Sequence, residues 1–544
     1  MAVAMYPWLV LAIALILLVV LGHVLYHYYT DPKESYQLAM VTVILSLSVS
    51  FLCTLLIPID IYVISQGDIN SEALHLKVSR DLVRTAYLSL FSLLLFLAFF
   101  LVPYAYFYGE ERGDVGDDPF CGRAKGALRS TAFFIGFILA LLLVGLNFRP
   151  GKSETLDGGD AVRWVDQLLD LDHNGLNAVC FCIACLTLAG VLGWALYTAY
   201  GLAAMPFEWL RSKQSAAEQR QELESSIAAV REKYQLIQAK YCCDTDNGAS
   251  PDLSAMRAAD RREFTRLQRE QRHLTQYNYR LQELEQRAGA LIPQMLLCLV
   301  PFRFAIGVSM MLTSLLVVLS LLITLIDRWL HSTCGWECGY SVKARGIFNP
   351  TDEVLLVSSR FFPLDFVLLA FIVLYAFAAS VYGIAALGIR VLCFNIYTLR
   401  SRRSLPQALL VLCNILSHIL LALCMVLLTI APDYTAFGAQ AEPKGGHSTH
   451  HECPSQDMYT AETTFGSGDP TVCRISMIAT FFARITLSMP LFSVAYYLAN
   501  WIFVVVFFGV FLHCAVCQER KEYVNTKRYD DAEDEEEVGL LSLT

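Results

Sequence analysis

Two aspartates lie inside long apolar stretches of the sequence, where a carboxylate is costly and indicates function by default. Asp60 belongs to "LLIPIDIYVIS" and Asp365 to "FFPLDFVLLAF", each two residues after a proline. Two chemistries fit this pattern. The acids either cap or hydrogen-bond neighbouring helices, which is the preferred interpretation, or they form a protonatable pair at one membrane face.

Asn414 and His418 are two more polar side chains in an apolar stretch. They are four residues apart, so they share one face of a helix. Hydrogen bonding between helices is the preferred interpretation. The alternative is that they line a translocation path together with Asp60 and Asp365.

Three histidines gather in "GGHSTHHE", as His447, His450 and His451. Imidazoles this close together can bind a metal ion or a corrin-type ligand, or respond to acid. A solvated loop explains the same letters, so they are a weak ligand or pH candidate and no metal site is predicted.

Four cysteines fall in two segments that we place outside the cytosol, where oxidation is permitted. The simplest pairing joins Cys334 to Cys338 and Cys453 to Cys473, and cross-pairing stays open. These four residues are the disulfide candidates.

The sequence ends in "EEEVGLLSLT", in which Glu536 precedes Leu540 and Leu541. An acid followed by two leucines at this spacing is typical of a cytosolic sorting signal for endosomes and lysosomes. We therefore expect clathrin adaptor complexes to bind this tail.

The elements that must position these residues are membrane-spanning helices. The chain has 544 residues, of which 56% are hydrophobic and only 17% charged, against about 25% charged in soluble domains. A span needs about 20 apolar residues. Such runs lie near 7–28, 39–64, 86–108, 131–148, 177–203, 304–326, 363–387, 407–431 and 491–513. The predicted fold is all-α, with nine transmembrane helices.

Lysine and arginine are denser in the loops that we assign to the cytosol, most clearly in "RSRRS" at 400–404, which sets the orientation. The amino terminus is then luminal or extracellular. The predicted parts are spans one to five in 1–203, a cytosolic insertion in 204–303, spans six to nine in 304–513 with luminal loops 327–362 and 432–490, and an acidic cytosolic tail in 514–544.

The insertion carries two apolar stripes at heptad spacing, which is typical of a coiled-coil-like helical hairpin. The stripes flank the breaker "CCDTDNGASPDLS". A hairpin packed on itself is the preferred interpretation, and a docking arm for a partner is the alternative. The stripe residues are Leu223, Ile227, Val230, Tyr234 and Ile237, then Leu267, Leu274 and Leu281 every seven residues, with Tyr277 and Leu284 between.

The sequence lacks several motifs that carry chemistry. No phosphate-binding G-x-x-x-x-G-K-[ST] loop, G-x-S-x-G elbow or H-E-x-x-H helix is present, so no enzyme is predicted. Nucleic-acid binding has no basic face to support it. The "NPT" at 349–351 is blocked as a glycosylation site by its proline.

Five stretches, in order along the chain, resemble the limb-region family of polytopic membrane proteins, in particular its cobalamin-escort branch. They are "LLIPIDIYVIS", "YTAYGLAAMPFEWLRSKQSAAEQR", "FFPLDFVLLAFIVLY", "RSLPQALLVLCNIL" and "FSVAYYLANWIFVVVFFGVF". The resemblance runs from the first span to the last and supplies no catalytic residues.

That resemblance implies a lysosomal membrane protein required for cobalamin (vitamin B12) to leave the lysosome, with cobalamin as cargo and no bound cofactor. It implies work with an ABC half-transporter of subfamily D. It also implies a plasma-membrane and clathrin-coated-vesicle role in endocytosis of the insulin receptor. The alternatives are an endocytic receptor for lipocalin-type cargo, or a transporter in its own right. Membrane lipids are expected partners, and a homodimer stays open.

Overall fold

A computed structural model gives the structure of this chain. The residues that it describes are 2–30, 35–65, 73–114, 120–147, 174–210, 302–332, 335, 347–361, 363–391, 394–397, 404–438, 475–488 and 490–516, with parts of 225–275.

The described elements are almost all helical. In chain order they are α1 (Ala2–Tyr29), α2 (Gln37–Ser65), α3 (Ala73–Phe96), η1 (Leu97–Leu101), α4 (Val102–Asp114), α5 (Phe120–Asn147), α7 (Asn174–Gly193), η2 (Trp194–Thr198), α8 (Ala199–Leu210), α12 (Arg303–His331), α13 (Pro350–Ser358), α14 (Leu364–Leu387), β1 (Ile389–Val391), β2 (Phe394–Tyr397), α15 (Pro406–Ile430), α16 (Pro432–Phe437), α17 (Met477–Ser488) and α18 (Pro490–Val516).

Eight helices in the described part are long and apolar enough to cross a membrane. The remaining apolar run corresponds to α1, of which Leu15–Tyr29 counts as a shorter apolar helix. In lipid every backbone polar group must be satisfied within the protein, and a helix does this within one segment. The predicted class, a polytopic helical membrane protein, is confirmed, with the count of nine approximate.

Two spans contain a short π-helical stretch. The stretch η1 joins α3 to α4 within the span Leu82–Glu111, and η2 joins α7 to α8 within Cys180–Leu210. A π-bulge inserts a residue into the helical ladder and re-aims the side chains that follow it. Neither stretch could be predicted from the sequence, because the apolar pattern continues through both.

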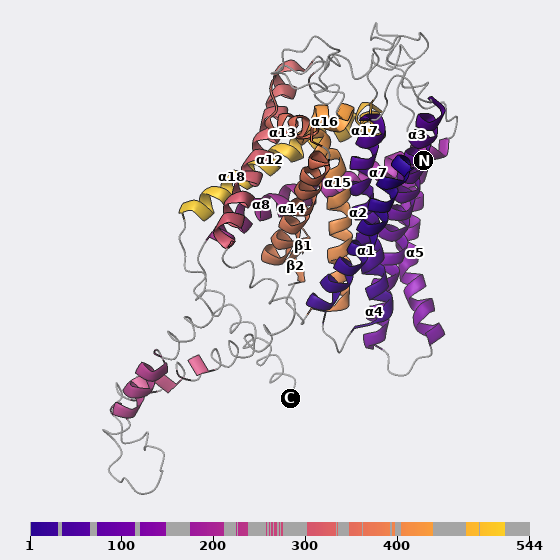
Figure 1. Cartoon of the computed structure of the whole chain (residues 1–544). Coiled ribbons are helices and arrows are strands. Elements are labelled where there is room, and N and C mark those ends of the chain that lie inside the picture. Colours follow the sequence, from indigo (N-terminus) through magenta and orange to yellow (C-terminus); the bar gives the residue numbers. More distant parts are fainter. Residues whose placement is uncertain are drawn as a thin grey trace. The chain divides into compact units, whose positions relative to one another are not determined.

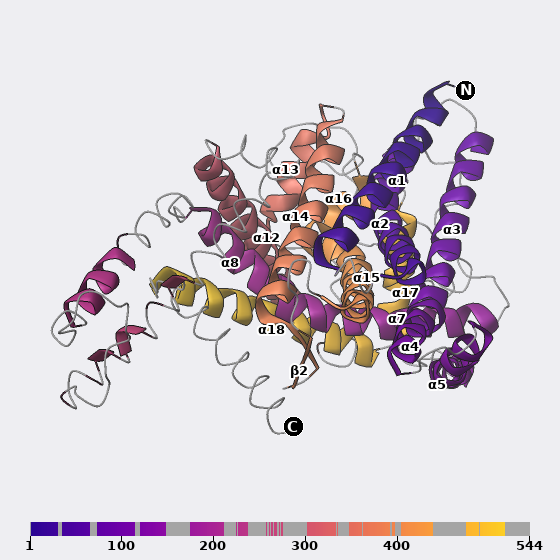
Figure 2. The same cartoon turned by 90° about the horizontal axis from the view of Figure 1, so that it is seen from below.

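Helix α15 is the centre of the bundle, and it packs most extensively against α2 and α7 (Figure 2). Two ends of the bundle are distinct in Figure 1. At one end, called the capped end below, the short helices α13, α16 and α17 lie across the long ones. At the other end, β1 and β2 follow α14.

The one sheet in the described part is the two-stranded hairpin of β1 and β2. Its strands pair antiparallel, with Val391 opposite Phe394 and Ile389 opposite Tyr397. Nearby, the Ser404 N–H donates to the Tyr29 carbonyl at 3.1 Å and so ties the end of α1 to the start of α15. The sequence predicted only a basic loop over 388–406.

Glycines let two of the helices approach very closely. A Cβ at Gly201 would lie 1.8 Å from the Ala379 carbonyl oxygen, and one at Gly383 would lie 2.0 Å from the Tyr197 carbonyl oxygen. These contacts join η2 and α8 to α14. Small residues at helix contacts are typical of membrane proteins, where close backbone packing replaces the hydrophobic driving force.

Residues Pro206–Met310 form a separate compact unit. Within it, Val230 and Leu267 are buried, and Tyr234 stacks on Phe264 with ring centroids 4.8 Å apart. Tyr234 of the first stripe thus contacts Phe264, three residues before Leu267 of the second stripe. The helical-hairpin arrangement of the insertion 204–303 and its cytosolic placement stay predictions.

Candidate functional site at the capped end of the bundle

Asp60 reaches from the last turns of α2 to the start of α17. Its side chain is 1% exposed, and its Oδ2 accepts a hydrogen bond from the Ile478 N–H at 3.0 Å. The first N–H groups of a helix have no partner inside the helix and carry partial positive charge. Asp60 therefore satisfies a donor at the amino terminus of α17, while Ser476 accepts from the Ala479 N–H at 3.3 Å.

Asp352 in α13 does the same for α16. Its carboxylate accepts from the Asp433 N–H at 3.1 Å and from the Tyr434 N–H at 3.0 Å. Pro432 is the first residue of α16 and has no N–H group. The next two N–H groups of this helix, those of Asp433 and Tyr434, both donate to the one buried carboxylate. Charge-assisted bonds of this kind are about twice as strong as neutral ones.

Asp365 lies in the first turn of α14 and contacts α16 from the other side. The Tyr434 hydroxyl donates to its Oδ2 at 2.8 Å, and both side chains are buried. Burial, then the negative charge of Asp365 and its hydrogen bond, raise the pKa of Tyr434 far above its ordinary value. Asp365 Oδ1 has no hydrogen-bond partner in the described part of the chain.

These three carboxylates are joined through α16. Ser476, just before α17, donates its N–H to the Ala436 carbonyl at 2.9 Å and its hydroxyl to the Thr435 carbonyl at 2.8 Å. α16 and α17 are thus each held by a carboxylate from a neighbouring segment. Asp60 and Asp365 lie at the same end of the bundle, and in their helices Tyr62 and Phe366 pack with ring centroids 6.2 Å apart.

Asn414 and His418 lie elsewhere, in the interior of α15. His418 Nδ1 bonds to the Asn414 carbonyl of its own helix, and Asn414 Oδ1 is buried with no partner among the described residues. At 1.5 Å per residue, His418 is about 18 Å along the helix from Ile430, where the capped end begins. The structure therefore does not bring these two residues to Asp60 and Asp365.

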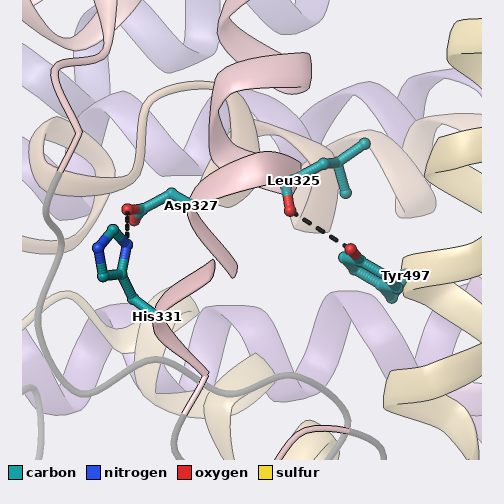
Figure 3. A network of polar contacts seen from close by, with 4 residues as sticks. All are labelled: Leu325, Asp327, His331 and Tyr497. Atoms are coloured by element: carbon teal, nitrogen blue, oxygen red, sulfur yellow. Dashed lines mark hydrogen bonds and ion pairs between the residues drawn. The ribbon is translucent and has the colours of Figure 1, made fainter. Parts of the chain in front are cut away.

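A fourth acid at the capped end belongs to α12. Asp327 is buried and bonds to His331 Nδ1 at 2.8 Å, four residues further on, while His331 is 45% exposed. Figure 3 shows this pair beside the bond from the Tyr497 hydroxyl to the Leu325 carbonyl, 3.4 Å long. The predicted span stopped at residue 326, yet α12 continues to His331, because a helix can keep a charge in its last turn.

Several predicted site residues lie outside the described residues. They are Cys334, Cys338, Cys453 and Cys473, then His447, His450 and His451, then Glu536, Leu540 and Leu541. Seven cysteines with described side chains form no disulfide, namely Cys53, Cys180, Cys182, Cys185, Cys413, Cys424 and Cys514. These residues keep the status of predictions.

Sequence reasoning missed Asp352 and Tyr434, although one signal was available. In "NPTDEV", Asn349 accepts from the Thr351 N–H at 3.0 Å as the N-cap of α13, and Pro350 is the first helical residue. Asparagine followed by proline and two acids is a helix-start pattern. Considered only as a glycosylation pattern, the same letters do not point to a helix start.

The fold and the capped end define a polytopic helical membrane protein in which buried carboxylates hold short helices across one end of the bundle. The chain belongs to the family of LMBR1-like membrane proteins, which matches residues 8–505. The resemblance to the limb-region family is therefore confirmed.

Named relatives match over almost the whole chain. A Nematostella vectensis protein described as a probable lysosomal cobalamin transporter is 30% identical over 97% of both chains. A Bos taurus protein described as lysosomal cobalamin transport escort protein LMBD1 is 29% identical over 98% of this chain and 97% of the relative. A probable lysosomal cobalamin transporter of Sclerotinia sclerotiorum is 29% identical, covering 99% of this chain and 92% of its own. No solved structure matches this chain significantly.

Proposed function

We propose that this chain is a multi-pass protein of the lysosomal membrane that assists the release of cobalamin to the cytosol. The observation that carries the proposal is the match, over nearly the full length, to relatives named for lysosomal cobalamin transport in two animals and a fungus. The proposal includes no catalytic step, and in the proposed orientation the capped end faces the lumen.

An escort role is favoured over an independent transporter. The names of the relatives divide on this point, since some are described as escort proteins and others as probable transporters. Asp60, Asp352 and Asp365 all serve as acceptors for neighbouring segments. Groups engaged in this way support the packing of helices, whereas a translocation path needs polar groups that remain available to the cargo.

We propose as partner an ATP-driven transporter, specifically an ABC half-transporter of subfamily D. The sequence has no phosphate-binding loop of its own, so an active export step needs a second protein to bind ATP. Copurification of the full chain from lysosomal membranes, followed by identification of the bound proteins, tests this partner. Recovery of the chain without any ABC protein, under conditions that keep a known complex intact, contradicts it.

Reconstitution into vesicles distinguishes an escort role from an independent transport role. Vesicles containing the purified chain alone should show no cobalamin flux above empty vesicles, and flux should appear when the ABC partner and ATP are added. Flux with the chain alone would establish the transporter alternative. Cobalamin retained in lysosomes of cells that lack the gene, and released when the gene is restored, tests the function itself.

Delivery to the lysosome is proposed to depend on Glu536, Leu540 and Leu541 binding clathrin adaptors. Replacing both leucines of this pair with alanine should move the chain to the plasma membrane, while Leu543→Ala, two residues away, serves as the matched control. An unchanged location contradicts the sorting proposal. The endocytic alternative, with the insulin receptor or lipocalin-type cargo, predicts instead that the surface-trapped variant loses cargo uptake while cobalamin release persists.

A further inference from the structure

Helix α1 has one packed face and one exposed face. Leu18, Gly22, Tyr26 and Thr30 are buried, at four-residue spacing, and α1 packs against α2. Gly22 permits the close contact, because a Cβ there would lie 3.3 Å from the Ile44 Cα. Most of the residues between these positions are exposed, although Leu25 and Tyr29 are partly buried.

Two histidines lie on the exposed face. His23 and His27 are both exposed and four residues apart, with ring centroids 4.4 Å apart and an angle of 70° between the rings. Neither ring has a hydrogen-bond partner among the described residues. Two imidazoles on an otherwise apolar helix cost free energy in or near a membrane, and such groups are functional candidates by default.

The separation of the rings fits a shared metal ion. Imidazole nitrogen binds transition metals at about 2.0–2.1 Å, which places two ring centroids about 4.5 Å apart for ligands at a right angle and about 5.2 Å apart at a tetrahedral angle. The observed 4.4 Å matches the first arrangement. Right-angle ligands belong to octahedral and square-planar ions such as Ni²⁺ and Cu²⁺, which also favour imidazole.

The position along the helix favours a cation as well. His27 lies in the last turn of α1, where the carbonyl groups without helical partners give a partial negative charge. Tyr28 and Tyr29 follow directly, and tyrosines near the end of a span are typical of the membrane interface. An ion held here would be reachable from water.

We propose that His23 and His27 together bind one divalent transition-metal ion, with right-angle coordination of the Ni²⁺ or Cu²⁺ type. In the described part of the chain, no group of three or more His, Cys, Asp or Glu side chains is placed to hold a metal. The remaining coordination positions therefore belong to water or to a second molecule. This site is independent of the proposed cobalamin function. The cobalt of a corrin offers protein ligands only its two opposite axial positions, so two adjacent imidazoles fit a free ion instead.

Equilibrium binding of Ni²⁺ alone to the purified full chain in lipid nanodiscs tests the proposal. The chain should carry no histidine tag, and His447, His450 and His451 should be changed to alanine so that this histidine cluster does not contribute to binding. One Ni²⁺ per chain should bind. His23→Ala or His27→Ala should weaken binding about a hundredfold, because the second ligand acts at high effective concentration.

Two control variants make the result specific. His331→Ala removes an exposed histidine that pairs with Asp327, and it should leave Ni²⁺ binding unchanged. Combining His27→Ala with Tyr28→His keeps two imidazoles but places them five residues apart, about 140° around the helix, and should abolish chelation. Equal Ni²⁺ affinity in the parent and in His23→Ala, or in the shifted variant, would overturn the proposal. A spectral change of aquocobalamin that needs only one of the two histidines, with no Ni²⁺ binding, would overturn it too.

Discussion

Asp352 shows how much a single residue contributes at the capped end. Its carboxylate is the acceptor for two backbone N–H groups of α16 and is 4% exposed. Without this acceptor, buried donors lose their partner, which costs about 1–3 kcal/mol for a buried polar group.

Asp352→Ala should therefore lower the free energy of unfolding by about 1–3 kcal/mol, measured by thermal melting of the purified chain. Asp352→Asn keeps one acceptor oxygen and should cost less. Glu353→Ala changes the adjacent acid, whose side chain is only half-buried, and serves as the control. Equal melting temperatures for Asp352→Ala and Glu353→Ala would show that the cap is not needed.

Tyr434→Phe should remove the one hydrogen bond that the Asp365 side chain accepts within the described part of the chain. A hydrogen bond to a charged group contributes about 1.5–3 kcal/mol. The variant should therefore have a free energy of unfolding lower by a similar amount, and a lower melting temperature. A double-mutant cycle with Asp365→Ala isolates the pair. The two single changes should together cost more than the double variant. Strictly additive effects would mean that this bond contributes nothing.

Tyr434 also makes the stability of the fold depend on pH. The pKa of Tyr434 is raised above 10.0 by burial first, and by the nearby charge of Asp365. A raised pKa in the folded state means that the contribution is complete below the unfolded value and is lost as pH rises above it. The difference in melting temperature between the wild type and Tyr434→Phe should be constant below about pH 10 and shrink above it. A difference that is unchanged at higher pH contradicts this assignment.

At the level of whole elements, α16 exists because other elements hold it. A six-residue helix is too short to be stable alone in water. It is fixed at its start by Asp352, along its side by Asp365 through Tyr434, and at its end by Ser476. Its position thus depends on segments that are far apart in the sequence.

Close contact between α7 and α15 gives a prediction about helix packing. A Cβ at Gly190 would lie 1.9 Å from the His418 carbonyl oxygen, so the helices must separate to accept one. Gly190→Ala should cost about 1–3 kcal/mol or more, the usual range for overpacking. Gly136→Ala in α5 is the matched control, because no atom lies within 4 Å of its added Cβ. Equal yields of monodisperse protein from both variants would contradict this contact.

The sequence was sufficient for the long helices and insufficient for the short ones. Runs such as 39–64 and 407–431 correspond within two residues to α2 and α15, because about 20 apolar residues leave no other stable choice in lipid. Asp60 and Asp365 were found since acids in such runs are rare. Asp352 was missed because its role depends on α16, more than 80 residues away. The local pattern in "NPTDEV" indicates a helix start, but it does not indicate which distant segment Asp352 binds.

Across the described part of the molecule, the buried polar residues differ in how they are bonded. Asp60, Asp352 and Asp365 at the capped end accept hydrogen bonds from neighbouring segments, whereas Asn414 in the interior has a buried oxygen without a partner among the described residues. The cap on α17 explains Asp60 as a structural acceptor, and the bond from the Tyr434 hydroxyl explains Asp365. The alternative from the sequence, a protonatable pair that responds to an acidic lumen, makes a different prediction for the living cell.

The structural role and the protonatable pair can be distinguished in cells that lack the gene and express Asp60→Asn or Asp365→Asn. If the acids are structural, each variant should reduce the amount of mature protein, because a weaker cap shifts more chains toward degradation. Cobalamin release divided by the amount of lysosomal protein should then equal that of the wild type. The amount is measured by quantitative immunoblotting of purified lysosomes, and Asn414→Ala, remote from the caps, serves as a comparison. Normal amounts of Asp60→Asn or Asp365→Asn with lost release would reject the structural role and establish that the charge itself is needed.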